Sequence, residues 1–288
     1  MKIRIVSPAK AIDNSKLEYA KDWLTSNGFE VEVSPHAGGQ FHYFSGTDKE
    51  RLQDLQEALD DPDVDVVMCS RGGYGTVRII DKISFNKFRE KPKMVVGYSD
   101  ITVLHNRITK MGFHSIHATA PLNFEENTAE SLESLINAIN GRPNTYHIPA
   151  HKLNKFGEIE AEVVGGNLTI IESLIGTDDD LNMNGKILLI EDIGEAIYAV
   201  DRVMWTLKKS GKLEKVGGLI VGGMTGMKDS EVPFGKTVEE VIADAVSEYD
   251  IPVCFNFPAG HIDDNRAIVL NKKALLSVTP LSVSFSQD

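Results

Sequence analysis

The stretch that decides the fold reads Lys-Met-Val-Val-Gly-Tyr-Ser-Asp-Ile-Thr-Val-Leu-His and runs from Lys93 to His105. Its first half is a short apolar run typical of a buried strand, and the half that begins at Ser99 has the apolar spacing of a helix. Ser99 therefore stands at a corner between a strand and a helix. Such a corner exposes the side chain and points the following backbone N–H groups at an incoming oxyanion. Ser99 is thus a candidate nucleophile.

The pattern around Ser99 is incomplete. Gly97 precedes the serine by two residues, but the second glycine of a Gly-x-Ser-x-Gly elbow is missing because position 101 is Ile. A serine at the start of a helix can also act only as its N-cap. The segment by itself leaves both roles open.

Strand and helix patterns alternate on both sides of this corner. Strands are expected at 1–7, 64–70, 93–98, 113–119, 158–164, 186–192, 217–223 and 251–257, with helical patterns between most of them and a β-rich tail over 267–286. This alternation predicts an α/β protein with a largely parallel sheet. We expect a doubly wound N-terminal domain over residues 1–124, a connection over 125–158, and a C-terminal α/β domain with a β-rich tail over 159–288.

Composition narrows the class of protein. The 288 residues carry a formal charge of -12 and 42% hydrophobic residues, as expected of an ordinary globular chain. An acidic chain repels a phosphate backbone, which argues against nucleic acid as a partner. No segment has the length of a membrane span or the apolar core of a secretory signal. Together with two cysteines in apolar strand-like segments, these features predict a cytoplasmic protein.

A glycine-rich loop follows the predicted strand 64–70 and reads Arg-Gly-Gly-Tyr-Gly from Arg71. Adjacent glycines allow close backbone approach or positive φ, so Gly72 or Gly73 could supply a second donor to an oxyanion. A tight turn or a phosphate cradle is the alternative, although the Walker lysine of a P-loop is absent.

The strand KILLIED ends in two acids, Glu191 and Asp192. Side chains alternate along a strand, so only one of the two can face a site at the sheet edge. A buried carboxylate there could orient a catalytic histidine. Alternatively, Asp192 caps a helix and Glu191 is solvated.

Among the histidines, His261 differs from the rest because it lies in a loop at the carboxyl end of the strand IPVCFNF, where α/β proteins place their sites. A loop histidine without a catalytic role is the alternative. His114 and His117 are three apart on a predicted strand and should face opposite sides, and His105 should point away from Ser99. No zinc-binding pattern is present, and we expect no metal. Cys69 and the Ser84-x-x-Lys87 pattern are weaker nucleophile candidates, because neither has a supporting partner.

Five segments together carry a family resemblance: SRGGYGTVRIID, VVGYSDITVLH, VVGGNLTIIESLIGT, LLIEDIGEAIYAVDRVMWTL and FPAGHIDDNRAIVL. In order and spacing, from about residue 3 to residue 280, the chain resembles the LD-carboxypeptidase family of serine peptidases. That family also includes the microcin immunity peptidases.

The resemblance implies roles for particular residues. Ser99 would be the nucleophile, Glu191 would orient the histidine, and His261 would be the base. The oxyanion would be held by the backbone of the glycine loop, at Gly72 and Gly73, and of Asp100. The resemblance also implies two domains, a homodimer, no cofactor and no metal.

The expected reaction is amide hydrolysis through an acyl-enzyme, removing the terminal D-alanine from a muropeptide tetrapeptide in cell-wall recycling. Substrate-binding candidates are Arg71, Asn167 and Arg202, and Arg266 also lies in one of the segments. One departure is His117-Ala-Thr-Ala-Pro121 where family members commonly show His-Gly-Pro, so the pocket wall is expected to differ. Two alternatives remain: an immunity-type peptidase that cleaves aminoacyl or peptidyl nucleotide conjugates, and a non-catalytic sugar or nucleotide binding protein.

Overall fold

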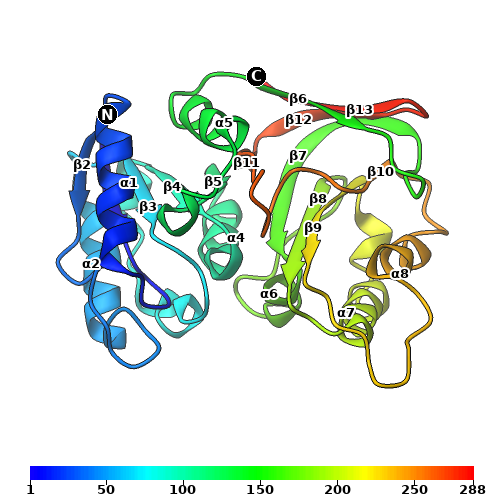
Figure 1. Cartoon of the computed structure of the whole chain (residues 1–288), viewed down its shortest axis with the longest axis horizontal. Helices are drawn as coiled ribbons and strands as arrows, with labels where there is room; N and C mark the ends of the chain where they lie inside the picture. Colours follow the sequence, from blue (N-terminus) through cyan, green and yellow to red (C-terminus); the bar gives the residue numbers. More distant parts are fainter.

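The computed structural model describes all residues from 1 to 288 and shows two lobes side by side, each built around one sheet (Figure 1). The N-terminal lobe contains the corner at Ser99, and the C-terminal lobe contains the strand that ends in Glu191. The predicted α/β class with two such parts is confirmed.

The N-terminal sheet has six strands in the order β11-β5-β4-β3-β1-β2, all parallel except β11, which pairs antiparallel with β5. The strands are β1 (Lys2–Val6), β2 (Glu30–Val33), β3 (Val66–Cys69), β4 (Met94–Gly97), β5 (Ser115–His117) and β11 (Ile268–Leu270). Every residue of β3 is buried, as expected of a central parallel strand covered on both faces.

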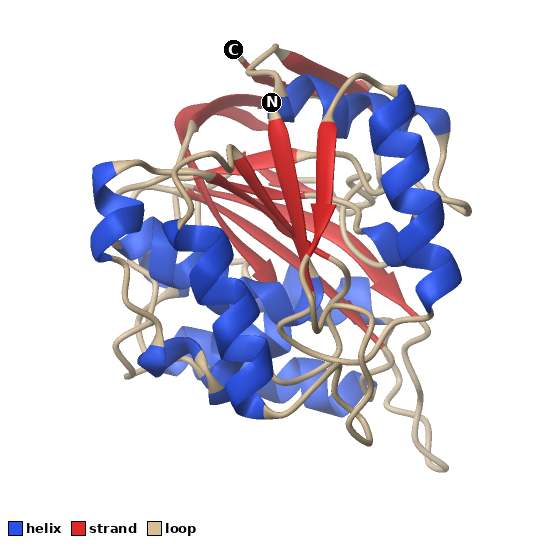
Figure 2. Ribbon diagram, turned by 90° about the vertical axis from the view of Figure 1, so that its left-hand side faces the viewer, coloured by secondary structure: helices blue, strands red, loops and turns tan.

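Helices cover both faces of this sheet (Figure 2). They are α1 (Asn14–Ser26), α2 (Asp48–Asp60), α3 (Asn86–Glu90), α4 (Thr102–Lys110) and α5 (Ala129–Ile139). One core unites α1 and α5 with one face, through side chains such as Leu24 and Leu135, and a second core unites α2, α3 and α4 with the other, through side chains such as Leu55 and Leu104. α2 begins with a complete capping box between Thr47 and Glu50.

The C-terminal sheet has seven strands in the order β10-β9-β8-β7-β12-β13-β6. Its parallel part consists of β7 (Gly157–Asn167), β8 (Ile187–Ile193), β9 (Gly218–Thr225) and β10 (Val253–Cys254). Its antiparallel part consists of β6 (Asn144–Pro149), β12 (Lys273–Val278) and β13 (Ser282–Gln287). The helices α6 (Leu168–Ser173), α7 (Ile197–Lys209) and α8 (Val238–Ala245) share one core with the parallel strands.

The chain crosses between the lobes more than once. In the expected connection 125–158, α5 packs into the N-terminal core, whereas β6 is the edge strand of the C-terminal sheet. After His261 the chain returns, and β11 joins the N-terminal sheet beside β5. Sequence periodicity could not reveal which lobe each of these elements joins, because this depends on contacts with segments far away in the chain.

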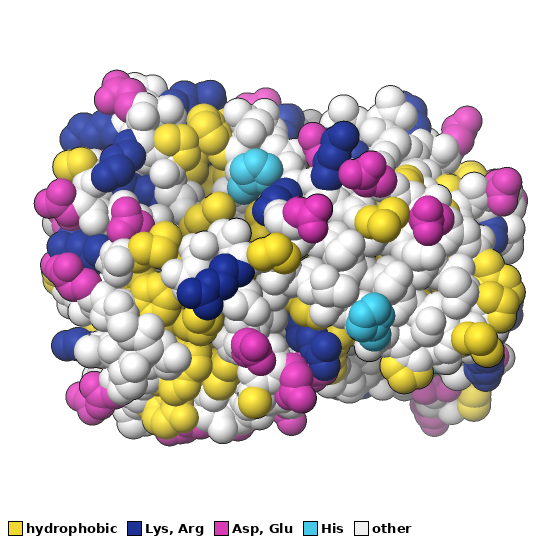
Figure 3. Space-filling view, turned by 90° about the horizontal axis from the view of Figure 1, so that it is seen from above, with side chains coloured by type: hydrophobic (Ala, Val, Ile, Leu, Met, Phe, Trp, Pro, Cys, Tyr) yellow, Lys and Arg dark blue, Asp and Glu magenta, His cyan; other side chains and the backbone are white.

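The surface is mixed in character. Basic and acidic side chains are interspersed on the face in Figure 3, and apolar side chains gather mainly over the N-terminal lobe on the left of that view. None of the helices combines the length and the apolar character that crossing a membrane requires.

Candidate active site

Ser99 lies at a sharp turn between β4 and a 3-10 helix, Ser99–Ile101, that continues into α4. Its φ is 64°, in the left-handed region that residues with a Cβ seldom adopt. Neither helix start has a side-chain cap hydrogen bond, so Ser99 is not used as a cap. The backbone strain instead holds a partly exposed hydroxyl above the end of the sheet, as in a nucleophile elbow.

The glycine loop passes directly beside this serine. A Cβ on Gly72 would lie 2.6 Å from Ser99 Cβ, 2.8 Å from Ser99 Oγ and 3.0 Å from the backbone nitrogen of Asp100. Only glycine permits that approach. Gly73 has a φ of 114°, which also favours glycine. The N–H groups of Gly72 and Asp100 have no acceptor within the protein, and both lie next to the hydroxyl, as oxyanion donors must.

The side chain of Asp100 ties this loop to the serine corner. Asp100 is buried, and its Oδ2 accepts a hydrogen bond of 2.8 Å from the N–H of Thr76. Burial raises the pKa of the Asp100 carboxyl above its ordinary value. The fully buried Arg51 donates to the carbonyl of Gly75 at 3.0 Å. The loop is therefore fixed at its far end, and its position over Ser99 does not depend on a ligand.

Glu191 and His261 form a hydrogen-bonded pair in the other lobe. Nδ1 of His261 lies 2.6 Å from Oε2 of Glu191, and the Glu191 side chain is fully buried. Gly260 makes this contact possible, because a Cβ there would lie 2.5 Å from the same carboxylate oxygen and its φ is 100°. The orientation leaves Nε2 of His261 free for a proton transfer.

The two groups perturb each other's pKa. Burial raises the pKa of Glu191, but the nearby imidazoles of His117 and His261, the latter hydrogen-bonded to it, outweigh burial and bring the pKa down to about 2. Burial lowers the pKa of His261, but the hydrogen bond and the negative charge of Glu191 outweigh it, so the net shift is upward. Glu191 is thus ionised, and it stabilises a proton that His261 takes up.

Asp192 points the other way along the strand. Its carboxylate accepts hydrogen bonds from Asn167 Nδ2 at 2.8 Å, from the N–H of Thr169 at 2.9 Å and from Thr169 Oγ1 at 2.7 Å. Asp192 therefore caps the start of α6, which was one part of the alternative given for this strand end. The other part, a solvated Glu191, is wrong, because Glu191 is fully buried.

Tyr98 brings the two halves of the site together. Its ring centroid lies 4.9 Å from that of His261, and Tyr98 directly precedes Ser99. No hydrogen bond joins Ser99 Oγ to His261, and such bonds are often long before a substrate binds. The lobes are also fastened by Thr102 Oγ1, which accepts a hydrogen bond of 3.0 Å from the N–H of Asn167.

Comparison with known proteins agrees with this geometry. Residues 3–118 match the LD-carboxypeptidase N-terminal domain, and residues 160–276 match the LD-carboxypeptidase C-terminal domain. The chain belongs to the LD-carboxypeptidase family. It is accordingly a serine-type carboxypeptidase, and the predicted family is confirmed.

Several members resemble this carboxypeptidase over nearly its whole length. A probable murein peptide carboxypeptidase of Bacillus subtilis is 31% identical, covering 96% of this chain and 88% of its own. A murein tetrapeptide carboxypeptidase of Pseudomonas aeruginosa is 29% identical, covering 96% and 92%. The crystal structure of muramoyltetrapeptide carboxypeptidase from Oxalobacter formigenes has a TM-score of 0.91 at 28% identity, covering 100% and 98%.

A second group of relatives carries a different name. The microcin C7 self-immunity protein MccF of Escherichia coli is 25% identical, covering 98% of this chain and 91% of its own. The solved structure of MccF in complex with glutamyl sulfamoyl guanosine has a TM-score of 0.87 at 22% identity, covering 100% and 96%, which shows the shared fold.

The carboxypeptidase's substrate-binding candidates are placed differently from one another. Arg71 is partly buried, donates to the carbonyl of Ala11 at 3.2 Å, and has no carboxylate partner. Burial lowers its pKa. Arg202 is exposed, and Arg266 is held by Asp264 at 2.9 Å. Asn167 is buried; its Nδ2 donates to Asp192 and its Oδ1 accepts from the N–H of Ile170, and its role in substrate binding stays a prediction.

His117 is the site residue that the sequence did not single out. It is fully buried at the carboxyl end of β5, in register with Gly97 of β4, and its Nε2 lies 3.9 Å from Glu191 Oε1. His114 lies outside the strand, so the expected alternation between the two did not apply. The position of His117 at the end of the strand next to the nucleophile strand was the available signal. Ala118, Thr119 and Ala120, where the sequence departs from the family, are all buried.

The remaining reactive side chains are engaged elsewhere. His105 lies between Ser115 Oγ and the carbonyl of Gly97, both at 2.9 Å, so both of its ring nitrogens are already engaged. Cys69 is fully buried, and burial raises the pKa of its thiol. No group of three or more His, Cys, Asp or Glu side chains has the arrangement of a metal site.

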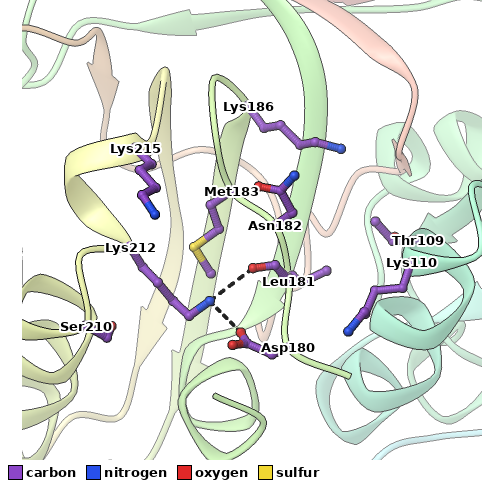
Figure 4. A pocket seen from close by; sticks show the side chains of 10 residues that line it. All are labelled: Thr109, Lys110, Asp180, Leu181, Asn182, Met183, Lys186, Ser210, Lys212 and Lys215. Atoms are coloured by element: carbon purple, nitrogen blue, oxygen red, sulfur yellow. Dashed lines mark hydrogen bonds and ion pairs between the residues drawn. The ribbon is translucent and has the colours of Figure 1, made fainter. Parts of the chain in front are cut away.

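A separate cavity of about 550 Å³ lies at the opposite end of β8 from Glu191 (Figure 4). Lys110 and Lys215 extend into it from opposite sides, while Lys212 is paired with Asp180 at 2.5 Å. Lys186 is paired with Glu162 at 2.6 Å. The C-terminal ends of α4 and α7 adjoin this cavity, and lysines complement the partial negative charge of such ends. Ion pairs therefore account for Lys186 and Lys212, and the C-terminal end of α4 accounts for Lys110.

Proposed function

We propose that Ser99, Glu191 and His261 form a catalytic triad that removes the terminal D-alanine from muropeptide tetrapeptides. One observation carries the proposal: His261, paired with the buried Glu191, contacts Tyr98 of the other lobe, and Tyr98 directly precedes a serine with a φ of 64°. The names of the relatives from Pseudomonas aeruginosa and Oxalobacter formigenes supply the class of substrate.

The reaction runs in two stages. His261 takes the proton of Ser99, and the serine oxygen attacks the scissile carbonyl. The N–H groups of Gly72 and Asp100, with Gly73 adjacent, hold the oxyanion. His261 then protonates the leaving D-alanine, and the acyl-enzyme remains on Ser99. A water activated by His261 attacks this ester, which releases the shortened peptide and restores the serine. Glu191 holds the imidazole in place throughout.

Arg71 is the best-placed group for the free carboxylate of the substrate. Its guanidinium is partly buried and has no carboxylate partner, and both Tyr43 and the Tyr98 that contacts His261 lie near it. A guanidinium can bind a carboxylate through two parallel hydrogen bonds. An exopeptidase needs such an anchor, because it must recognise the chain end. Arg202 is exposed, and Arg266 is already paired with Asp264, so neither is as well placed.

A second candidate substrate is an aminoacyl or peptidyl nucleotide conjugate. The exposed aromatic side chains of Phe41, Tyr43 and Tyr74 favour it, because aromatic rings can stack on a base. Tyr43 lies beside the glycine loop, since its hydroxyl would be 3.3 Å from a Cβ on Gly73. The likeness to MccF is the other support.

One experiment separates these substrates. The purified protein is assayed with a tetrapeptide ending in D-alanine, with its L-alanine and C-terminally amidated counterparts, and with an aminoacyl sulfamoyl adenosine. Each 1.4 kcal/mol of lost transition-state binding is about tenfold, and an unpaired buried carboxylate costs more than that, so we expect at least about 10² in favour of the free D-ended peptide. Equal rates for all three peptides contradict the proposal, and faster cleavage of the nucleotide conjugate supports the second candidate.

A non-catalytic binding protein remains to be distinguished by labelling. A fluorophosphonate should react with Ser99 in the wild type and fail to react in Ser99→Ala. A protein that only binds sugars or nucleotides would not be labelled.

The cellular setting belongs to the proposal as well. We place the reaction in the cytoplasm, in peptidoglycan recycling, with the protein as a homodimer. Support comes from the two cysteines, which are free thiols as in a reducing compartment. Sedimentation of the purified protein tests the dimer, and fractionation of cells tests the location.

A further inference from the structure

Three buried polar atoms meet behind the candidate triad without hydrogen-bond partners. Nδ1 and Nε2 of His117 and Oε1 of Glu191 are all buried and all lack a partner. Nε2 and Oε1 face each other at 3.9 Å. Buried polar atoms are nearly always paired, and a buried carboxylate needs more than one donor. An approach of about 1 Å would bring the two atoms within hydrogen-bond distance.

The two residues belong to different lobes. His117 ends β5 of the N-terminal sheet, and Glu191 lies in β8 of the C-terminal sheet. His117 is in register with Gly97, two residues before Ser99. The contact therefore connects the sheet that carries Ser99 with the carboxylate of Glu191, which holds His261.

We propose that His117 is a positioning residue that donates its Nε2–H to Glu191 Oε1, so that the carboxylate is held between a histidine from each lobe. This inference rests on the triad of the proposed function. The donation requires only a hydrogen on Nε2, which both the imidazolium and one neutral tautomer carry. It fixes the carboxylate plane, and with it the ring of His261 on the other oxygen.

The donation also tempers the basicity of His261. A carboxylate that accepts a bond on Oε1 attracts the proton on His261 less strongly through Oε2. Without His117, Glu191 would be a stronger acceptor for His261 alone, and its own protonation would become easier. The stronger bond to His261 raises the pKa of His261, and the easier protonation raises the pKa of Glu191. Each change raises the pH below which the pair is inactive.

Other groups near the pair do not produce this effect. Tyr98 donates to Asn123 Oδ1 at 2.7 Å, and burial raises its pKa, so it remains neutral. His105 lies behind His117, and burial lowers its pKa to about 3. Asp192 sits on the other face of β8 and is held by Asn167 and Thr169.

The experiment compares His117→Leu, which removes the donor, with His117→Gln, which keeps an amide donor. The titration of the His261 ring is followed by NMR, and kcat/KM is followed against pH. In His117→Leu we expect the His261 titration and the acid limb of kcat/KM to move to higher pH, and kcat to fall by about tenfold or more while KM changes little. His117→Gln should recover most of both.

His105→Leu is the matched control, because His105 is equally buried but contacts Ser115 and Gly97 instead of Glu191. It should lower the melting temperature without moving the His261 titration. An unchanged His261 titration in folded His117→Leu overturns the inference, and so does an equal movement in His105→Leu. The NMR measurement does not require turnover, so a wild type that releases no D-alanine would refute the proposed function separately.

Discussion

The N-terminal half of the candidate active site positions its groups through the backbone, whereas the C-terminal half does so through buried charge. The position of Ser99 depends on its left-handed φ and on the close approach of the glycine loop, which a side chain at Gly72 would prevent. His261 depends on a fully buried carboxylate 2.6 Å away. The difference predicts which substitutions damage each half. Substitutions that add a side chain should damage the N-terminal half, and substitutions that remove a charge should damage the C-terminal half.

The largest effect is expected from the nucleophile itself. Ser99→Ala should remain folded and lower kcat by about 10⁴ or more, because members of a triad act as a unit. Turnover of the D-ended tetrapeptide and thermal unfolding give the two measurements.

The double variant Ser99→Ala with His261→Ala should lose little beyond the single one. A Ser99→Ala protein that keeps a tenth of the wild-type rate would remove Ser99 from the mechanism, and with it the comparison between the two halves.

The next effect tests the charged half. Glu191→Gln keeps the shape but can present an amide N–H to Nδ1 of His261, which favours the wrong tautomer, so kcat should fall by roughly 10³ to 10⁴. Steady-state kinetics at pH 8 measure the loss.

Asp192→Asn is the matched control on the neighbouring residue. It disturbs the cap of α6 and the bond to Asn167, so we expect a lower melting temperature and a much smaller loss of kcat. If the Asp192 change were the more damaging to kcat, the assignment of the two strand faces would be incorrect.

The backbone half is tested by one methyl group. In Gly72→Ala, the new Cβ would lie 2.6 Å from Ser99 Cβ, so the loop must shift away and its N–H leaves the oxyanion position. Loss of one oxyanion donor lowers kcat by about 10². Active-site titration with a fluorophosphonate, together with kcat, measures this.

Gly28→Ala gives the contrast within the same lobe. Gly28 has a φ of 88° and nothing within 4 Å of a Cβ, so alanine there should cost only backbone strain of about 1 to 2 kcal/mol and leave kcat unchanged. Equal kinetics for the two glycine variants would show that the loop over Ser99 does not take part.

The sequence predicted the local features of the site better than its long-range ones. The corner at Ser99 and the alternation of Glu191 and Asp192 follow from local periodicity, and the structure shows both. The place of β11 beside β5 and the burial of His117 against Glu191 depend on pairing between segments far apart in the chain. The hydrogen bond from the Asn167 amide to Asp192, 25 residues further along the chain, is likewise a long-range contact that no local pattern indicates.

The smallest effect concerns pH, and it separates the two halves without removing any catalytic group. His261 must be neutral to accept the proton of Ser99. Although burial lowers its pKa, the hydrogen bond and charge of Glu191 outweigh burial and raise it, so His261 becomes protonated at a higher pH than an ordinary histidine. The acid limb of kcat/KM should therefore lie above about pH 6.5, and the rate should fall about tenfold for each pH unit below the limb. Gly72→Ala alters only the backbone half, so its limb should coincide with that of the wild type although its rate is lower. Glu191→Gln removes the charge that raises the pKa, so its residual activity should persist to lower pH. A limb that moves in Gly72→Ala, or stays in place in Glu191→Gln, would show that backbone and charge are not separable contributions in this site.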